Sequence, residues 1–213
     1  MKINLIEIQF VYYFKSNSIL TEKTINFYDR IKEKICQNIK SVKFNNLLPI
    51  PDQPIIHITD TTNNVLLFQQ PQAEQQRCDF IFKEKNDSGN LLVEKFKKTC
   101  DQINELLKQD FVINRLGAIA TFENLSFENS NEFLNNMGVK TNFNNINMFN
   151  LLFEEIIDLD DKKISKYTRF IKATRQGKQF IVQKDFNSGI NNNPLPEDFI
   201  TKFKNIFFEE ILK

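Results

Sequence analysis

The densest group of residues able to do chemistry in this chain is an acidic run followed directly by a basic run. The acidic run places five carboxylates within eight positions: Glu154, Glu155, Asp158, Asp160 and Asp161. From residue 162 to residue 184 there is no acidic residue, and the basic ones are Lys162, Lys163, Lys166, Arg169, Lys172, Arg175, Lys178 and Lys184. Aromatic residues are interleaved with them. Such a segment can follow a phosphate backbone and stack on bases. One hypothesis is therefore a nucleic-acid-contacting subunit that uses the hairpin 162–184, with the first seven of these basic residues as its contacts.

The same pattern also fits a solvated hairpin whose charge the acidic run compensates. The apolar spacing predicts a helix over 145–158, and carboxylates at the end of a helix oppose its dipole and attract lysines. A formal net charge of +1 gives the whole chain no general attraction to nucleic acid.

The segment Asp158-Leu159-Asp160-Asp161 offers the hard oxygen ligands that Mg²⁺ and Ca²⁺ prefer. It lacks the glycine-containing loop of an EF-hand, so we predict no metal site here. A hydrolase with a dispersed carboxylate site stays open as a further alternative.

Residues typical of catalytic sites are scarce. The chain has one histidine, His57, three cysteines and no tryptophan. Histidine is the readiest proton carrier near neutral pH and the commonest metal ligand. Asp60 lies on the opposite strand face from His57, so nothing nearby orients the imidazole as a base. The cysteines, Cys36, Cys78 and Cys100, lack the paired spacing of a disulfide framework or zinc site. The sequence therefore leans away from an enzyme and indicates no cofactor.

Length and composition are those of a globular protein. A mass of 25.2 kDa, with 41% hydrophobic and 26% charged residues, suits one domain over 1–213, divisible into similar halves 1–110 and 111–213. Glu7 interrupts the first apolar run, and no apolar stretch is long enough to cross a bilayer. We predict a cytoplasmic protein without membrane contact, and leave its oligomeric state open.

The periodicity predicts an α+β fold, with a mostly antiparallel sheet and helices packed on one face. The strands are expected at 3–13, in a hairpin on either side of 60–64, at 77–85, 111–122, 164–174 and 178–186, with a turn at Gln176-Gly177. The helices are expected at 21–43, 92–107, 130–137 and 145–158, and after Pro194-Leu195-Pro196.

Two features are candidates for partner binding. Arg115 lies in the most apolar strand, where a charge is costly unless it is paired, so it reaches water or a carboxylate, or else lines an anion or partner site. The last helix carries Phe199, Phe203 and Phe208, more aromatic surface than one stripe needs.

Four segments carry a resemblance to a known family: VLLFQQPQ, LLVEKFKKTCDQINELL, VINRLGAIATF and GKQFIVQKDFN before the terminal helix. They resemble a family of uncharacterised prokaryotic proteins of similar length, sporadically distributed among genomes. This chain departs from it at Ala118-Ile119-Ala120, where the family tends to carry Arg-Tyr. The resemblance implies a fold and an accessory gene of the kind found in defence islands, and it implies no activity. Together with the missing catalytic residues, it favours a non-enzymatic interaction subunit of a larger prokaryotic assembly, such as an anti-phage system, with a protein partner.

Overall fold

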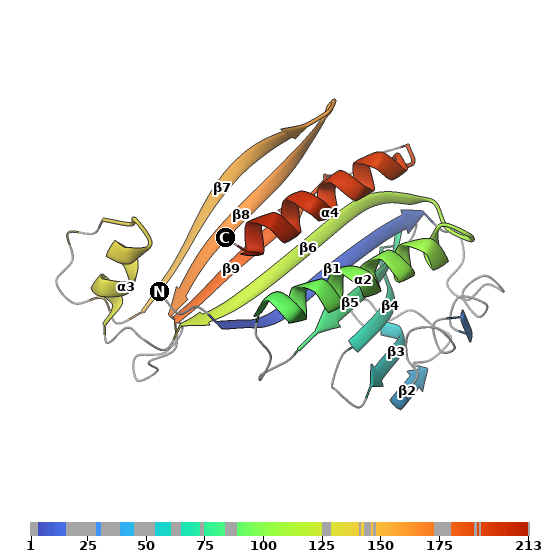
Figure 1. Cartoon of the computed structure of the whole chain (residues 1–213), viewed down its shortest axis with the longest axis horizontal. Helices are drawn as coiled ribbons and strands as arrows, with labels where there is room; N and C mark the ends of the chain where they lie inside the picture. Colours follow the sequence, from blue (N-terminus) through green and yellow to red (C-terminus); the bar gives the residue numbers. More distant parts are fainter. Residues whose placement is uncertain are drawn as a thin grey trace.

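The computed structural model describes residues 4–15, 29–30, 39–44, 54–60, 65–72, 75–83, 89–124, 129–140, 142, 146, 148–172, 180–189, 191 and 193–212. Its strands form one nine-stranded antiparallel sheet in the order β2-β3-β4-β5-β1-β6-β9-β8-β7 (Figure 1). The strands are β1 (Asn4–Lys15), β2 (Ile39–Phe44), β3 (Pro54–Asp60), β4 (Val65–Gln72), β5 (Gln75–Phe82), β6 (Ile113–Asn124), β7 (Phe149–Leu159), β8 (Lys162–Lys172) and β9 (Phe180–Asn187). The helices are α2 (Gly89–Leu107), α3 (Ser130–Asn136) and α4 (Glu197–Leu212). The predicted α+β class is confirmed.

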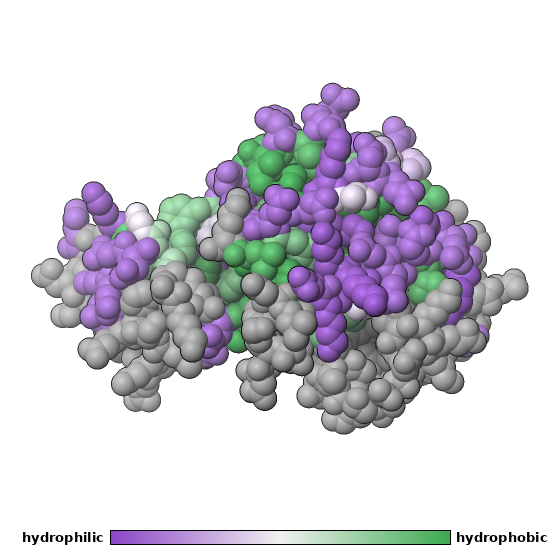
Figure 2. Space-filling model, viewed as in Figure 1, coloured by the Kyte–Doolittle hydropathy of each residue, from purple (hydrophilic) through white to green (hydrophobic). Residues whose placement is uncertain are grey.

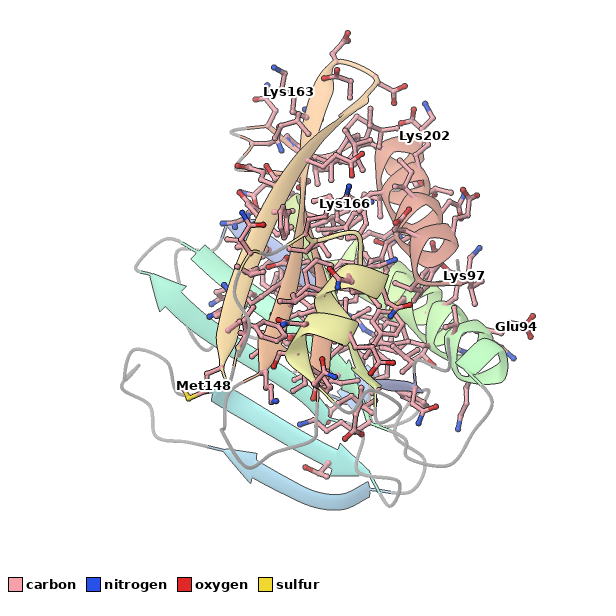
Figure 3. All side chains as sticks on the ribbon, turned by 90° about the vertical axis from the view of Figure 1, so that its left-hand side faces the viewer. Glu94, Lys97, Met148, Lys163, Lys166 and Lys202 are labelled. Atoms are coloured by element: carbon pink, nitrogen blue, oxygen red, sulfur yellow. The ribbon has the colours of Figure 1, made fainter. Side chains whose placement is uncertain are left out.

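Alternation along each strand separates two faces of the sheet. On β1, Phe10 and its even-numbered neighbours are buried under the helices, and the Phe10 ring meets Phe203 and Phe207 of α4 edge-on at 5.9 and 6.3 Å. Burial of each such ring contributes about 1.5–3 kcal/mol. Figure 3 shows α2 and α4 together on one side of the sheet. We call the opposite side, which carries Gln9 and Tyr13 on β1, the open face.

Helices α2 and α4 lie side by side across the middle of the sheet (Figure 1). Helix α2 forms because its apolar residues recur every three or four positions, and these are buried: Val93, Phe96, Cys100, Ile103 and Leu107. Its outer face reaches α4 through an ion pair between Asp101 and Lys204. In the described part of the chain, no helix has both the length and the apolar character needed to cross a membrane.

The short helix α3 confirms the helix predicted at 130–137. Asn129 caps it by accepting a hydrogen bond from the backbone N–H of Glu132 at 2.8 Å. Gly138 follows the helix with a positive φ of 77°. Phe133 of α3 stacks on Phe180 of β9 with ring centroids 4.7 Å apart, which holds the helix against the end of the sheet.

The prediction of a helix over 145–158 is wrong, because residues 149–159 form strand β7. β7 pairs with β8 at every position from Phe149 to Leu159, and a two-residue loop of Asp160 and Asp161 joins the two strands. Asp160 has a positive φ of 53°, as tight hairpin loops require. The apolar spacing that suggested a helical stripe belongs to a strand with apolar side chains on both faces.

The predicted helix over 21–43 is wrong at its end, because β2 begins at Ile39 and pairs with β3. Residues 29 and 30 are helical, and the rest of that prediction lies outside the described residues, as do the turn at Gln176-Gly177 and the tip of the first hairpin. The other predicted strands and helices are confirmed within a few residues of their expected bounds.

The order of elements repeats across the centre of the sheet. β1 and β6 are neighbours, β5 lies beside β1, and β9 lies beside β6; α2 then follows β5, and α4 follows β9. The two helices also share a short sequence pattern, VEKFK at 93–97 and ITKFK at 200–204. This topology has the form expected of halves 1–110 and 111–213, and their origin by duplication stays a prediction.

Candidate interaction surface

Strand β7 forms one edge of the sheet. It is eleven residues long, and its pairing with β8 runs without a register shift. Edge strands are usually short, bulged or interrupted by proline, because unpaired backbone N–H and C=O groups invite pairing with another chain. β7 has none of these three features, and no other strand in the described part of the chain lies along its outer side.

The side chains of β7 combine exposed apolar groups with carboxylates. Leu152 is 53% exposed, and Phe153 and Ile156 are each 48% exposed. Glu154, Glu155 and Asp158 are exposed on the same strand, which carries no lysine or arginine. Figure 2 shows hydrophobic surface over β7 and β8 between hydrophilic side chains. Large apolar side chains clustered at an unpaired edge are typical of a protein-binding surface.

The basic run lies on β8 and β9, and strand alternation sends its members to opposite faces of the sheet. On the helix side, Lys162 donates to Asn191 Oδ1 at 3.0 Å, and Lys172 donates to Ser130 Oγ at 3.2 Å. On β9, Lys184 donates to the carbonyl oxygen of Glu210 at 2.8 Å. These lysines are held by groups of the same chain.

Lys166 joins the β7–β8 hairpin to α4. Its Nζ lies 3.1 Å from Glu155 Oε2 and 2.9 Å from Glu210 Oε1, and its side chain is 13% exposed. Burial lowers the pKa of Lys166, but hydrogen bonds to Glu210 and Glu155 outweigh it, so the pKa is raised overall. At the hairpin tip, Lys202 of α4 lies 2.8 Å from both carboxylate oxygens of Asp160. Ion pairs with α4 therefore orient the hairpin.

Lys163 and Arg169 lie on the open face of β8, opposite in direction to Lys166. Figure 3 shows Lys163 pointing away from the helices and Lys166 lying between the hairpin and α4. Arg175 and Lys178 lie outside the described residues. The described basic side chains thus do not share one face, and the nucleic-acid contact proposed for 162–184 stays a prediction.

Arg115 lies on the open face, where two neutral groups of adjacent strands hold it. Its Nε donates to Asn187 Oδ1 at 3.1 Å, and its guanidinium carbon lies 4.6 Å from the centre of the Tyr13 ring. Burial raises the pKa of Asp185 on β9, and this effect outweighs the lowering of that pKa by the nearby Arg169 and Arg115. The predicted partner or anion site at Arg115 is thus part of a mixed polar cluster, and its binding role stays a prediction.

The open face also holds a buried carboxylate that the sequence did not single out. Asp79 of β5 is fully buried, accepting hydrogen bonds from Gln9 Nε2 at 2.7 Å and Arg77 Nε at 2.8 Å. These groups come from two strands, so only the β1–β5 register brings them together. A charged residue within an apolar strand pattern was the one available signal.

The three phenylalanines proposed as partner contacts lie in the core. Phe199, Phe203 and Phe208 are 2%, 0% and 3% exposed. Phe208 meets Phe96 of α2 edge-on at 6.1 Å between ring centroids, so the extra aromatic surface of α4 packs against the neighbouring helix. None of these three rings is accessible to a partner in this conformation.

The described residues with catalytic potential are dispersed. Cys78 and Cys100 are buried thiols, and burial raises the pKa of Cys100 well above its ordinary value. His57 pairs through its backbone with Lys43 and Leu67, while its side chain and Cys36 lie outside what the structure describes. Among the described residues, no three histidine, cysteine, aspartate or glutamate side chains gather closely enough to hold a metal ion. The described residues therefore form no carboxylate cluster that would support the hydrolase hypothesis.

Comparison with protein-family models, curated proteins and solved structures gave no match to this chain.

Proposed function

We propose that this protein is a non-enzymatic interaction subunit of a larger assembly, and that it binds a protein partner along the outer edge of β7. The observation that carries the proposal is a regular eleven-residue edge strand that exposes Leu152, Phe153 and Ile156. Adding a strand to such an edge satisfies its backbone hydrogen-bonding groups and buries the apolar side chains. The resemblance to a family of accessory prokaryotic proteins favours an anti-phage assembly as the setting.

The charges of β7 favour one kind of partner. Glu154 and Asp158 project from the open face, and Glu155 projects from the helix face, where Lys166 already pairs with it. A partner strand whose open-face side chains, at every second residue of its sequence, are by turns apolar and basic would place a cation opposite Glu154 and Asp158 while it covers Leu152 and Ile156. We therefore expect a strand from another protein in which apolar and basic residues share one face.

A second copy of the chain fits this edge less well. Pairing of β7 with β7 of another copy would bring four carboxylates onto the open face of one interface, because each strand contributes Glu154 and Asp158 there and no basic residue, while Glu155 is held by Lys166. Carboxylates without opposite charges disfavour strand pairing. The same charges also protect the edge from self-association in the absence of its partner.

Two matched pairs of variants test the proposal. Leu152→Ser removes an apolar group from β7, and Leu212→Ser removes one of similar exposure, 51% against 53%, from the end of α4. Glu154→Lys reverses a charge on β7, and Glu94→Lys reverses an exposed charge on α2. Tagged wild type and variants are purified from the native cells, and the partner is then isolated and titrated against each variant. We expect Leu152→Ser and Glu154→Lys each to weaken binding about tenfold, with both controls unchanged.

Three results would overturn the proposal. The protein is recovered without a partner under mild conditions; the partner binds the β7 variants as tightly as wild type; or Leu212→Ser and Glu94→Lys weaken binding as much as the β7 variants. Equal effects of the two sets would show that the partner binds a surface other than the β7 edge, or that the substitutions affect folding in general.

A further inference from the structure

The end of α2, the start of α4 and the start of β6 enclose a hollow of about 230 Å³. Figure 1 shows the last turn of α2 beside the first turn of α4. The inner wall is made of buried side chains: Asn104, Phe111, Ile113, Leu195 and Ile200. The rim is made of exposed ones: Lys108, Val112, Pro194 and Glu197. The hollow is thus apolar inside and polar at its mouth, which is the usual character of a small-molecule site.

One polar side chain of the inner wall has an oxygen without a partner among the described residues. Asn104 is 4% exposed, and its Oδ1 accepts no hydrogen bond from any group that the structure describes. A buried acceptor left unpaired costs free energy, so a ligand that donates to it gains a hydrogen bond on entering. The amide that lines the hollow therefore selects for a ligand with an N–H or O–H group.

The charges at the rim restrict the ligand further. Lys108 Nζ lies 2.6 Å from Glu105 Oε1 and 3.0 Å from Glu197 Oε1, so two carboxylates already neutralise the only cation among the lining residues that the structure describes. Hydrogen bonds to Glu105 and Glu197 raise the pKa of Lys108, which keeps it charged and paired at neutral pH. The three side chains sum to a net negative charge, and this disfavours an anionic ligand.

We propose that this hollow binds a neutral, flat, largely apolar molecule of about two fused rings that donates one hydrogen bond to Asn104. Cavities of about 150 Å³ lined by apolar side chains bind benzene, so the larger volume here has room for a second ring. Phe111, Ile113, Leu195 and Ile200 supply the apolar contact surface. This site is separate from the β7 edge and does not depend on the proposed partner.

Three probes of nearly equal shape test the proposal on the full-length protein. Indole donates a hydrogen bond, benzofuran can only accept one, and indene does neither. Isothermal titration should give indole a dissociation constant about tenfold lower than those of benzofuran and indene, because only indole satisfies the buried carbonyl. Amide chemical shifts of wild type, which require no variant, should change at Ile113 and Leu195 when indole is added and not along β7.

Variants then assign the preference to one atom. Asn104→Leu keeps a side chain of similar size and should abolish the preference for indole over indene. Asn135→Leu, at an exposed position of α3, should retain it. Ile200→Trp should fill the hollow and remove binding of all three probes. The proposal is overturned if no probe binds saturably at millimolar concentration, if indene or benzofuran binds as tightly as indole, if Asn104→Leu keeps the preference, or if the shifted amides lie elsewhere.

Discussion

Glu155 of β7 and Lys166 of β8 lie directly opposite each other in the hairpin, with Oε2 and Nζ 3.1 Å apart. This pair joins the acidic run to the basic run that follows it in the sequence. The two runs compensate each other across neighbouring strands, with Asp158 likewise opposite Lys163. The other carboxylates and the apolar side chains of β7 remain exposed at the edge of the sheet. The proposed function depends on this surface.

Replacing Lys166 should destabilise the fold. Lys166→Met leaves Glu155 and the half-buried Glu210 without this partner, and we expect a loss of about 1.5–3 kcal/mol in the free energy of unfolding. Lys163→Met, at an exposed position of the same strand, should change it by about 0.5 kcal/mol or less. Urea denaturation of both variants measures the difference. Equal stabilities would show that Lys166 does not hold the hairpin to α4.

The contribution of Lys166 should depend on pH in one direction. Its pKa is raised on folding above the ordinary value of 10.5, so the folded protein holds this proton more tightly than the unfolded chain. The resulting stability is fully present below pH 10.5 and is lost as the pH rises through the raised value. The difference in the free energy of unfolding between wild type and Lys166→Met should therefore narrow above pH 10.5. A difference that widens there would contradict the raised pKa of Lys166.

Asp185 should have the opposite effect on stability. Burial raises its pKa above the ordinary value of 3.8, so its ionised form is less favourable in the folded protein than in the unfolded chain. At pH values above the raised pKa this costs stability, and the cost disappears as the carboxyl becomes protonated in both states. Asp185→Asn should be more stable than wild type at pH 7 and equal to it below pH 3.8. Lower stability at pH 7 would mean that attraction to Arg169 and Arg115 outweighs burial.

Phenylalanines of the core and of the edge should respond differently to truncation. Phe203 is fully buried, and Phe203→Ala should cost about 3–5 kcal/mol. Phe153 is 48% exposed and contacts Phe170 edge-on at 5.8 Å, so Phe153→Ala should cost about 1 kcal/mol or less. Thermal and chemical denaturation measure both. A cost at Phe153 as large as that at Phe203 would place Phe153 in the core.

The thiols give a further check on the core. Cys78 and Cys100 are buried, and burial raises the pKa of Cys100, so neither should react rapidly with an aromatic disulfide reagent at pH 8. In urea all three cysteines should react. Rapid reaction of more than one thiol in the folded protein would contradict the packing of β5 and α2.

Local periodicity was sufficient to predict the helices and strands that bury one face. The stripe of Leu92, Phe96 and Cys100 predicts α2, and alternation predicts β1. β7 was mistaken for a helix because an edge strand exposes both faces and loses strict alternation, and because Phe149, Phe153 and Ile156 happen to recur at helical spacing. The Asp160-Asp161 loop could have indicated a β-hairpin here. It was missed because it lacks the glycine of the commonest two-residue loops.

The sites were less predictable than the elements. The basic residues are visible in the sequence, but their division between two faces follows from the strand register of β8. The contacts of Asp79 with Gln9 and the hollow beside Asn104 join residues that are distant in the chain. No local pattern encodes such pairs, because they depend on which strands become neighbours.

Hydrogen exchange along β7 tests the central claim most directly. In the free protein, the outward-facing amides of residues 149–159 have no partner strand among the described residues and should exchange rapidly, while amides paired with β8 exchange slowly. When the isolated partner is added, the account predicts slower exchange along β7 and in one extended, basic segment of the partner. Unchanged exchange along β7, with slower exchange on another surface of this protein, would contradict it.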